Sequence, residues 1–121
     1  MPCIYVYFFD GRPVYVGQTR QQFLARDRKH LVGGRSVFDR HYRHNKHRYS
    51  SKIIYERAHA TPRMLDYYEI AAIRRLNTYR AGLNGTPGGR MTKEMSFGFY
   101  GEKCRFWKAV LNTAFRKVKS S

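Results

Sequence analysis

The sequence predicts a small α+β domain in which a three-stranded antiparallel sheet is flanked by helices. Two runs of β-branched and aromatic residues surround the turn pair Asp10-Gly11, a pattern typical of a β-hairpin. A third run of this kind follows at Lys52 to Ala58. Apolar residues recur at helical spacing between Pro62 and Leu76, which predicts a helix with one buried face. Helices packed on one small sheet would bury all of these apolar faces.

The N-terminal part is predicted to form the hairpin and one helix. The two strands cover Cys3 to Phe9 and Pro13 to Gly17. Thr19 is a candidate cap for a helix that runs to about Val32, where the glycine pair Gly33-Gly34 would end it. The hairpin and the first helix are therefore expected to follow one another closely.

The next elements are a short helix, the third strand and a longer helix. The short helix is expected from about Ser36 to His44 and is crowded with Arg and His. After the third strand, Thr61-Pro62 is a good helix start, because a hydroxyl cap precedes proline at the first helical position. This helix should end near Leu76, and Ala81 to Arg90 is predicted to be a glycine-rich loop.

Charge is the strongest compositional signal. The chain has 121 residues, with 24 Lys and Arg against eight Asp and Glu, and a formal net charge of +16. A surface this basic attracts polyanions, so nucleic acid is the leading partner. No apolar run approaches the roughly 20 residues that span a bilayer, and a strand-like segment begins too early to leave room for a signal peptide. We therefore expect a cytoplasmic protein with no membrane partner.

The two cysteines, Cys3 and Cys104, are far apart in the sequence. Two such residues make neither a zinc-binding pattern nor a redox pair. We interpret them as free, reduced thiols of a cytoplasmic protein, with a structural disulfide as the alternative.

Glu69 departs most from its surroundings. It lies on the apolar face of the predicted long helix, four residues after Leu65 and four before Ile73. Burying an ionised carboxylate costs several kcal/mol unless a cation or hydrogen bonds accompany it. In so basic a protein, this position suggests a metal ligand beside a phosphate-binding surface. The alternative is a buried ion pair with an arginine, for which Arg26 is a candidate.

The histidines His41, His44 and His47 recur every third residue, a spacing that raises the question of a zinc site. No cysteine lies near them, and the surrounding Arg and Lys side chains would repel a cation. A basic face directed at DNA is the better interpretation of this segment.

Several short motifs occur in a definite order along residues 3 to about 90. Cys3-Ile4-Tyr5 and Tyr15-Val16-Gly17 lie on the two hairpin strands, and Arg26 and His30 follow four residues apart. Glu69 lies within an apolar helix, and Asn84 comes after that helix. Together these motifs resemble the GIY-YIG endonuclease family, with cysteine in place of the first glycine and valine in place of the second isoleucine. The resemblance implies a GIY-YIG-like nuclease core over residues 1–90.

The resemblance also implies a role for each matched residue. Glu69 would bind a single divalent ion, Mg²⁺ or Mn²⁺. Arg26 would stabilise the charge that develops on the attacked phosphate. Asn84 would orient groups around the scissile phosphate or support the fold nearby.

Tyr5 would act as general base on the attacking water or help to position it, with Tyr15 and His30 as partners in the same network. A free tyrosine has a pKa of about 10, so nearby cations would have to lower the pKa of Tyr5 for it to act as a base.

A shared site for Tyr5 and Tyr15 sets a condition on the hairpin. With a regular two-residue turn the two side chains would point to opposite faces, because successive strand residues alternate. They converge only if the loop has three residues or the hairpin contains a bulge, for which Pro13 is a candidate cause. We therefore expect an irregularity in this hairpin.

The activity that follows is a metal-dependent DNA endonuclease that cuts by direct attack of water, leaving the 5′-phosphate and 3′-hydroxyl ends that the resemblance implies. We expect double-stranded DNA as the partner and a monomer or weak dimer, of homing, phage or repair type; a phage-encoded protein would act in the host cytoplasm. The alternatives are a non-catalytic nucleic-acid-binding module and a restriction enzyme, which would need a specificity element. The basic residues expected to contact DNA are Arg20, Arg28, Lys29, Arg35, Arg40, Arg43, Lys46 and Arg90.

Residues 91–121 are expected to extend the same compact domain. They include a basic amphipathic helix predicted from Glu102 to Val118. Its apolar stripe must be buried, which favours packing on the core with a basic outer face, and contact with DNA or with a partner protein are the alternatives.

Overall fold

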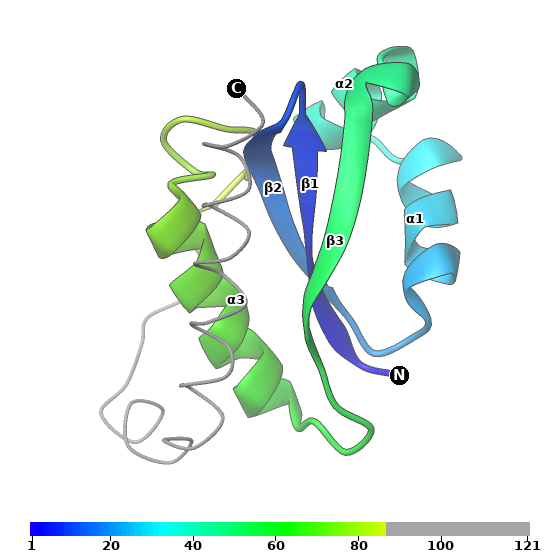
Figure 1. The fold of residues 1–121 in the computed structure, drawn as a ribbon. Helices are drawn as coiled ribbons and strands as arrows, with labels where there is room; N and C mark the ends of the chain where they lie inside the picture. The colour runs from blue at the N-terminus through cyan, green and yellow to red at the C-terminus, as the bar shows by residue number, and fades with distance from the viewer. Residues whose placement is uncertain (87–121) are drawn as a thin grey trace.

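The computed structural model describes residues 1–86, which form an α+β domain with three strands and three α-helices (Figure 1). The antiparallel sheet has the order β2-β1-β3. The strands are β1 (Cys3–Phe9), β2 (Arg12–Thr19) and β3 (Tyr49–Glu56), and the helices are α1 (Phe23–Leu31), α2 (Val37–His44) and α3 (Pro62–Leu76), with one 3₁₀ turn, η1 (Lys46–Arg48). The predicted α+β class with a three-stranded sheet is confirmed. The predicted helix from Glu102 to Val118 lies outside the described residues.

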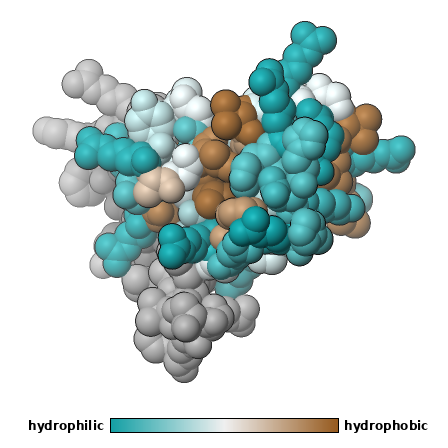
Figure 2. Space-filling view, turned by 90° about the horizontal axis from the view of Figure 1, so that it is seen from above, coloured by the Kyte–Doolittle hydropathy of each residue, from teal (hydrophilic) through white to brown (hydrophobic). Residues whose placement is uncertain are grey.

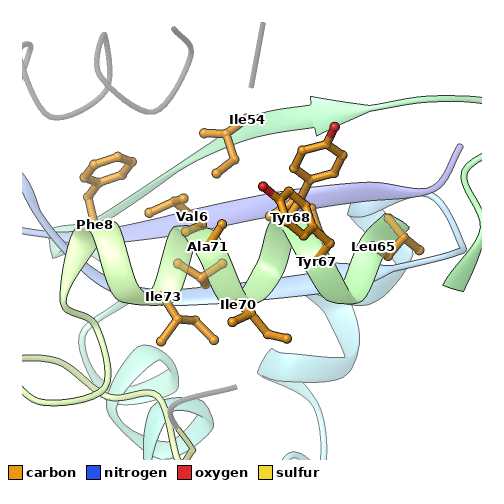
Figure 3. Packing of buried hydrophobic residues seen from close by; sticks show 12 residues of the cluster. Val6, Phe8, Ile54, Leu65, Tyr67, Tyr68, Ile70, Ala71 and Ile73 are labelled. Carbon is orange, nitrogen blue, oxygen red and sulfur yellow. The ribbon is translucent and has the colours of Figure 1, made fainter. Parts of the chain in front are cut away.

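Helices cover both faces of the sheet, so the domain has three layers (Figure 1). On one face, α3 packs against alternate residues of the strands, as Figure 3 shows for Val6 and Ile54 beside Tyr68. On the other face, α1 and α2 cover an aromatic cluster that includes Tyr5 and Tyr7. No helix within residues 1–86 is long and apolar enough to cross a membrane.

Helix starts follow the capping chemistry at two of the three helices. The Ser36 hydroxyl accepts from the Asp39 backbone N–H and begins α2, and the Thr61 hydroxyl accepts from the Met64 backbone N–H and begins α3. The prediction for α1 was wrong, because Thr19 is the last residue of β2 and its hydroxyl accepts from the Gln21 backbone N–H instead. The helix begins at Phe23, four residues after Thr19, with no side-chain cap.

The third strand begins at Tyr49, earlier than its apolar run predicted. Its first residues include the polar pair Ser50 and Ser51, which carry no hydrophobic signal of a strand. They are held in the sheet by pairing with Phe8 and Tyr7 of β1. Backbone pairing therefore extends this strand beyond what its side chains indicate.

The expected irregularity in the hairpin is present. Asp10 and Gly11 form a two-residue turn with φ values of 51° and 80°, and the register shifts between Tyr7 and Phe8. Tyr7 pairs with Tyr15, whereas Phe8 pairs with Pro13, so one residue of β2 is left over beside the proline. The bulge places Tyr15 on the same face as Tyr5, the face covered by α1 and α2.

The outer edge of β2 is closed by the segment after α3. The Leu83 N–H donates to the Val14 carbonyl (2.6 Å). The Asn84 side chain accepts from the Val16 N–H and donates to the Val16 carbonyl, both at 2.9 Å. A side-chain amide thus takes the place of a neighbouring strand and satisfies an edge that would otherwise be open.

Replacing Asn84 with Ala should destabilise the fold. The change leaves the N–H and carbonyl of the buried Val16 without these partners, and we expect a loss of about 1–3 kcal/mol in the free energy of unfolding. Urea denaturation measures this loss. The exposed Ser51→Ala serves as the control and should stay within about 0.5 kcal/mol of the wild type. Equal stability of Asn84→Ala and Ser51→Ala would show that the two hydrogen bonds between Asn84 and Val16 do not stabilise the fold.

Candidate active site

The candidate site is centred on the hydroxyl of Tyr5, in the middle of β1. This hydroxyl lies 2.9 Å from Nε2 of His30, and Nε of Arg26 donates to it at 3.4 Å. Arg26 and His30 are four residues apart on α1, so one face of that helix presents both groups to the same atom. Both side chains therefore face the body of the protein.

A buried carboxylate continues the chain of hydrogen bonds beyond His30. Nδ1 of His30 lies 2.6 Å from Oδ1 of Asp39, and both residues are buried. Burial would raise the pKa of Asp39, but hydrogen bonds from His30 and Ser36 outweigh it and lower that pKa, so the carboxylate is ionised at neutral pH. Burial lowers the pKa of His30, opposed by Asp39, which favours the neutral ring.

The protonation states define the direction of each hydrogen bond in this chain. An ionised carboxylate only accepts, so Nδ1 of His30 must carry the proton and donate to Asp39. In the neutral ring Nε2 is then an acceptor, and the Tyr5 hydroxyl donates to it. The Tyr5 oxygen in turn accepts from Arg26. The donors thus run in one direction, from Arg26 through Tyr5 and His30 to Asp39.

Gly17 makes room for the Tyr5 ring. The two residues pair across β1 and β2, and a Cβ built at Gly17 would lie 2.4 Å from the Tyr5 hydroxyl oxygen. Every residue with a side chain would therefore push this ring away. The glycine at the end of the second motif has a direct packing function here.

Tyr15 reaches the same cluster from β2. Its ring stacks on Phe38 of α2, with centroids 4.0 Å apart and planes within 10°, and it lies 5.6 Å from the ring of His30. It is half-buried, and burial raises its pKa, with Arg26 opposing and Glu69 adding to the rise. Tyr15 therefore lies within electrostatic reach of both charged groups of the candidate site.

Glu69 approaches from α3, which packs along β2. It is half-buried, and burial raises its pKa to about 7, with Asp66 adding to the rise and with a Gln18 hydrogen bond and Arg26 opposing it. Within residues 1–86 no ion-pair contact joins Arg26 to Glu69, so the alternative of a closed pair between these two residues is not observed. Gln18 and Arg26 therefore offset only part of the cost of burying the ionised Glu69 carboxylate.

The condition for Tyr5 to act as a general base, a pKa lowered by nearby cations, is not met. Burial raises that pKa well above its usual range, and the hydrogen bond from Arg26 only partly opposes the rise. The side chain is 0% exposed, so its hydroxyl meets Arg26 and His30 and not bulk water. This environment suits a neutral phenol that positions its neighbours, and the positioning of an attacking water by Tyr5 stays a prediction.

Glu69 fits a magnesium site in which the protein supplies few of the ligands. Within residues 1–86 no group of three or more His, Cys, Asp or Glu side chains surrounds a common point. Mg²⁺ keeps several waters and is commonly held by one or two carboxylates together with substrate phosphates. One half-buried carboxylate with an unusually high pKa, in electrostatic range of Arg26, is compatible with that donor set.

Asn84 does not share the Tyr5 network. Both polar atoms of its side chain bind the backbone of Val16, which matches the supporting role considered for it. A direct role at a scissile phosphate stays a prediction.

The residues expected to contact DNA are exposed wherever the structure describes them. Most lie on α1, α2 and the segments that join them, on the side of the sheet opposite α3 (Figure 1). Figure 2 looks down on the end where α2 lies and shows hydrophilic side chains around a strip of apolar residues. The exposed residues are Arg20, Arg28, Lys29, Arg35, Arg40, Arg43 and Lys46, and Arg90 lies outside the described residues.

The remaining sequence candidates have other partners or positions. His41 binds Tyr49 through Nδ1 and packs its ring on Phe9, whereas His44 and His47 are exposed. Cys3 is a buried free thiol, and burial raises its pKa to about 11. Cys104 lies outside the described residues.

Two acidic residues of the site were missed by the sequence reasoning. Asp39 holds His30, and Asp27 accepts from the hydroxyls of Tyr42 (2.7 Å) and Tyr7. A signal for Asp39 existed, because Ser36 and Asp39 have the spacing of a capping box. For Asp27 the partners come from β1 and α2, and no local pattern indicates them.

Comparison of the chain with protein-family models, with curated proteins and with solved structures gave no match.

Replacing Gly17 with Ala should displace Tyr5. The added Cβ would overlap the ring, so we expect the Tyr5–His30 hydrogen bond to break and the free energy of unfolding to fall by about 1–3 kcal/mol. Urea denaturation and the NMR signals of His30 report the two effects. Gly85→Ala is the matched control, because a Cβ there meets no atom within 4 Å. Unchanged His30 signals in Gly17→Ala would contradict the close contact.

The raised pKa of Glu69 predicts a pH-dependent stability. Between its ordinary value of 4.5 and its folded value of about 7, the folded protein holds a proton that the unfolded chain has released. The contribution of Glu69 to the free energy of unfolding should therefore fall as pH rises through this window and stay low above it. Glu69→Gln removes this titration, so its stability relative to wild type in urea should rise across the same window. A constant difference would show that the carboxyl titrates normally.

Proposed function

We propose that this protein is a metal-dependent endonuclease that hydrolyses phosphodiester bonds in DNA. The observation that carries the proposal is the convergence of Arg26 and His30 on the hydroxyl of Tyr5. Tyr15 and Glu69 lie within electrostatic range of Arg26. These groups come from β1, β2, α1 and α3, so packing of the whole domain is required to assemble them. The ordered motifs that resemble GIY-YIG nucleases lend independent support from the sequence.

Arg26 is the group that would meet the phosphate. A guanidinium has five N–H donors, and Tyr5 takes the one on Nε. The terminal nitrogens carry the other donors, in the fork geometry that matches two phosphate oxygens. Arg26 is half-buried, so a charge that develops on the phosphate would be stabilised in a partly water-excluded site.

Glu69 would hold the divalent ion, Mg²⁺ or Mn²⁺. When bound, such an ion supplies charge for the phosphate and an acidified water. The carboxylate can bind it only when ionised, and the pKa of about 7 makes binding weaker in acid than at neutral pH. Glu69 and Arg26 thus provide the two half-exposed charged groups of the site.

The basic surface would bring DNA to these groups. Exposed Arg and Lys side chains on and around α1 and α2 lie on the same side of the sheet as Arg26. Phosphate contacts of this type supply affinity without sequence preference. Double-stranded DNA is the substrate we propose, and a monomer is sufficient because one chain supplies every named residue.

A non-catalytic nucleic-acid-binding module is the second candidate. The net charge of +16 favours it as much as it favours the nuclease. It offers no reason for a carboxylate with a pKa raised to about 7 in the neighbourhood of Arg26 and Tyr5.

Cleavage of supercoiled plasmid DNA with Mg²⁺ distinguishes these two functions. We expect cutting by the wild type, inhibition by EDTA, and rates at least about 100-fold lower for Arg26→Ala and Glu69→Gln, because each removes a group that acts on the reacting phosphate. Both variants should still shift DNA in gels. Arg74→Ala, which removes an exposed arginine of α3, is the control and should cut at the wild-type rate.

The binding module would be supported by a different result. In that case the wild type binds DNA in the gel assay but cuts it with neither Mg²⁺ nor Mn²⁺.

A further inference from the structure

We infer that Asp39 is a positioning residue that sets the direction of the hydrogen-bond chain between Arg26 and itself. It does so by holding His30 in the tautomer with the proton on Nδ1. The inference rests on the proposed function for its effect on cleavage, but the effect on His30 does not depend on that function.

The contacts of Asp39 leave it one orientation. Oδ1 lies 2.6 Å from Nδ1 of His30, and Oδ2 accepts from the Ser36 backbone N–H at 3.3 Å. Asp39 is also the third residue of α2, and its own N–H donates to the Ser36 hydroxyl at 3.0 Å. The capping box therefore fixes the carboxylate at the start of a helix, with one oxygen left for the histidine.

Gly34 closes the site behind the carboxylate. A Cβ at this position would lie 2.4 Å from Oδ2 of Asp39. The loop between α1 and α2 thus packs directly against the carboxylate that holds His30, and a side chain at position 34 would displace it.

The tautomer matters because Tyr5 must serve two neighbours. With the proton on Nδ1, Nε2 accepts from the Tyr5 hydroxyl, and the Tyr5 oxygen is free to accept from Arg26. With the proton on Nε2, that nitrogen would donate to the same oxygen. Two donors would then compete there, and the hydroxyl hydrogen would have to turn toward Arg26. Loss of the Nδ1–H tautomer should therefore release Arg26.

Other groups around His30 do not replace Asp39 in this role. Tyr5 and Tyr7 face the ring from β1 and Tyr15 faces it from β2, and the pKa of each is raised, so all three are neutral. From α1, Arg26 disfavours and Asp27 favours a charged ring, and Asp27 accepts hydrogen bonds from the hydroxyls of two tyrosines. Asp39 is the carboxylate that contacts His30 directly.

The test is Asp39→Asn in the full chain, read by NMR and by plasmid cleavage. The amide keeps the size of the side chain but can donate as well as accept, so it no longer requires a proton on Nδ1. Long-range ¹⁵N–¹H spectra of His30 should show Nδ1–H in the wild type and a mixture or Nε2–H in the variant. Cleavage should fall roughly 10–100-fold with DNA binding retained, the range seen when an orienting partner is lost.

Ser36→Ala is the control for weakened capping of α2. It removes the hydroxyl of the capping box but keeps the Asp39 carboxylate, so it should lower stability and leave the His30 tautomer as in the wild type. If Asp39→Asn does not fold, the wild-type spectrum still decides, because a proton on Nε2 in the wild type overturns the inference.

The outcomes separate the inference from the proposed function. Equal His30 spectra for wild type and Asp39→Asn would overturn the role of Asp39 even if the protein cuts DNA. Retained full cleavage in a variant with an altered tautomer would also overturn it. A changed tautomer in a protein that never cuts DNA would refute the nuclease and support the assignment of Asp39.

Discussion

The hydroxyl of Tyr5 is the point on which the candidate site depends. It is buried in the central strand, and it joins Arg26 and His30 of α1 to the sheet, with Asp39 of α2 behind them. Each member of this chain is both a structural contact and a determinant of its neighbour's protonation. In a low-dielectric interior such a chain is strong when every donor has an acceptor, and costly when one is lost. The hydrogen bonds that attach α1 and α2 to the sheet are therefore the same ones that orient Arg26.

Two backbone features make that position possible. The bulge beside Pro13 turns Tyr15 to the face that Tyr5 already occupies, and the absent side chain at Gly17 gives the Tyr5 ring its space. The two hydrogen bonds between the Asn84 side chain and the Val16 backbone then hold β2 in place from its outer edge. Motif residues that look catalytic in a sequence thus divide into groups that carry charge and groups that shape the sheet. Asn84 and Gly17 belong to the second set.

Local chemistry explains which elements the sequence predicts well. The bounds of α3 were predicted because Thr61-Pro62 starts it and its apolar face is continuous. The start of α1 was missed because its first turn has no side-chain cap, and the start of β3 because backbone pairing, not side-chain pattern, holds Ser50 and Ser51. For the site, the four-residue spacing of Arg26 and His30, visible in the sequence, puts both on one face of α1. The condition that nearby cations lower the pKa of Tyr5 is not met, because burial outweighs the neighbouring arginine.

By itself, the sequence determined the α+β class, the basic surface and the identity of the charged residues, since each follows from composition or local periodicity. The tertiary structure decided that Glu69 is not closed in an ion pair with Arg26, and that Tyr5 is a neutral hydrogen-bond relay. It also decided that Asp39, a helix-capping residue in the sequence, holds His30. The physical reason is that burial and hydrogen-bond partners arise between segments far apart in the chain, and these set protonation.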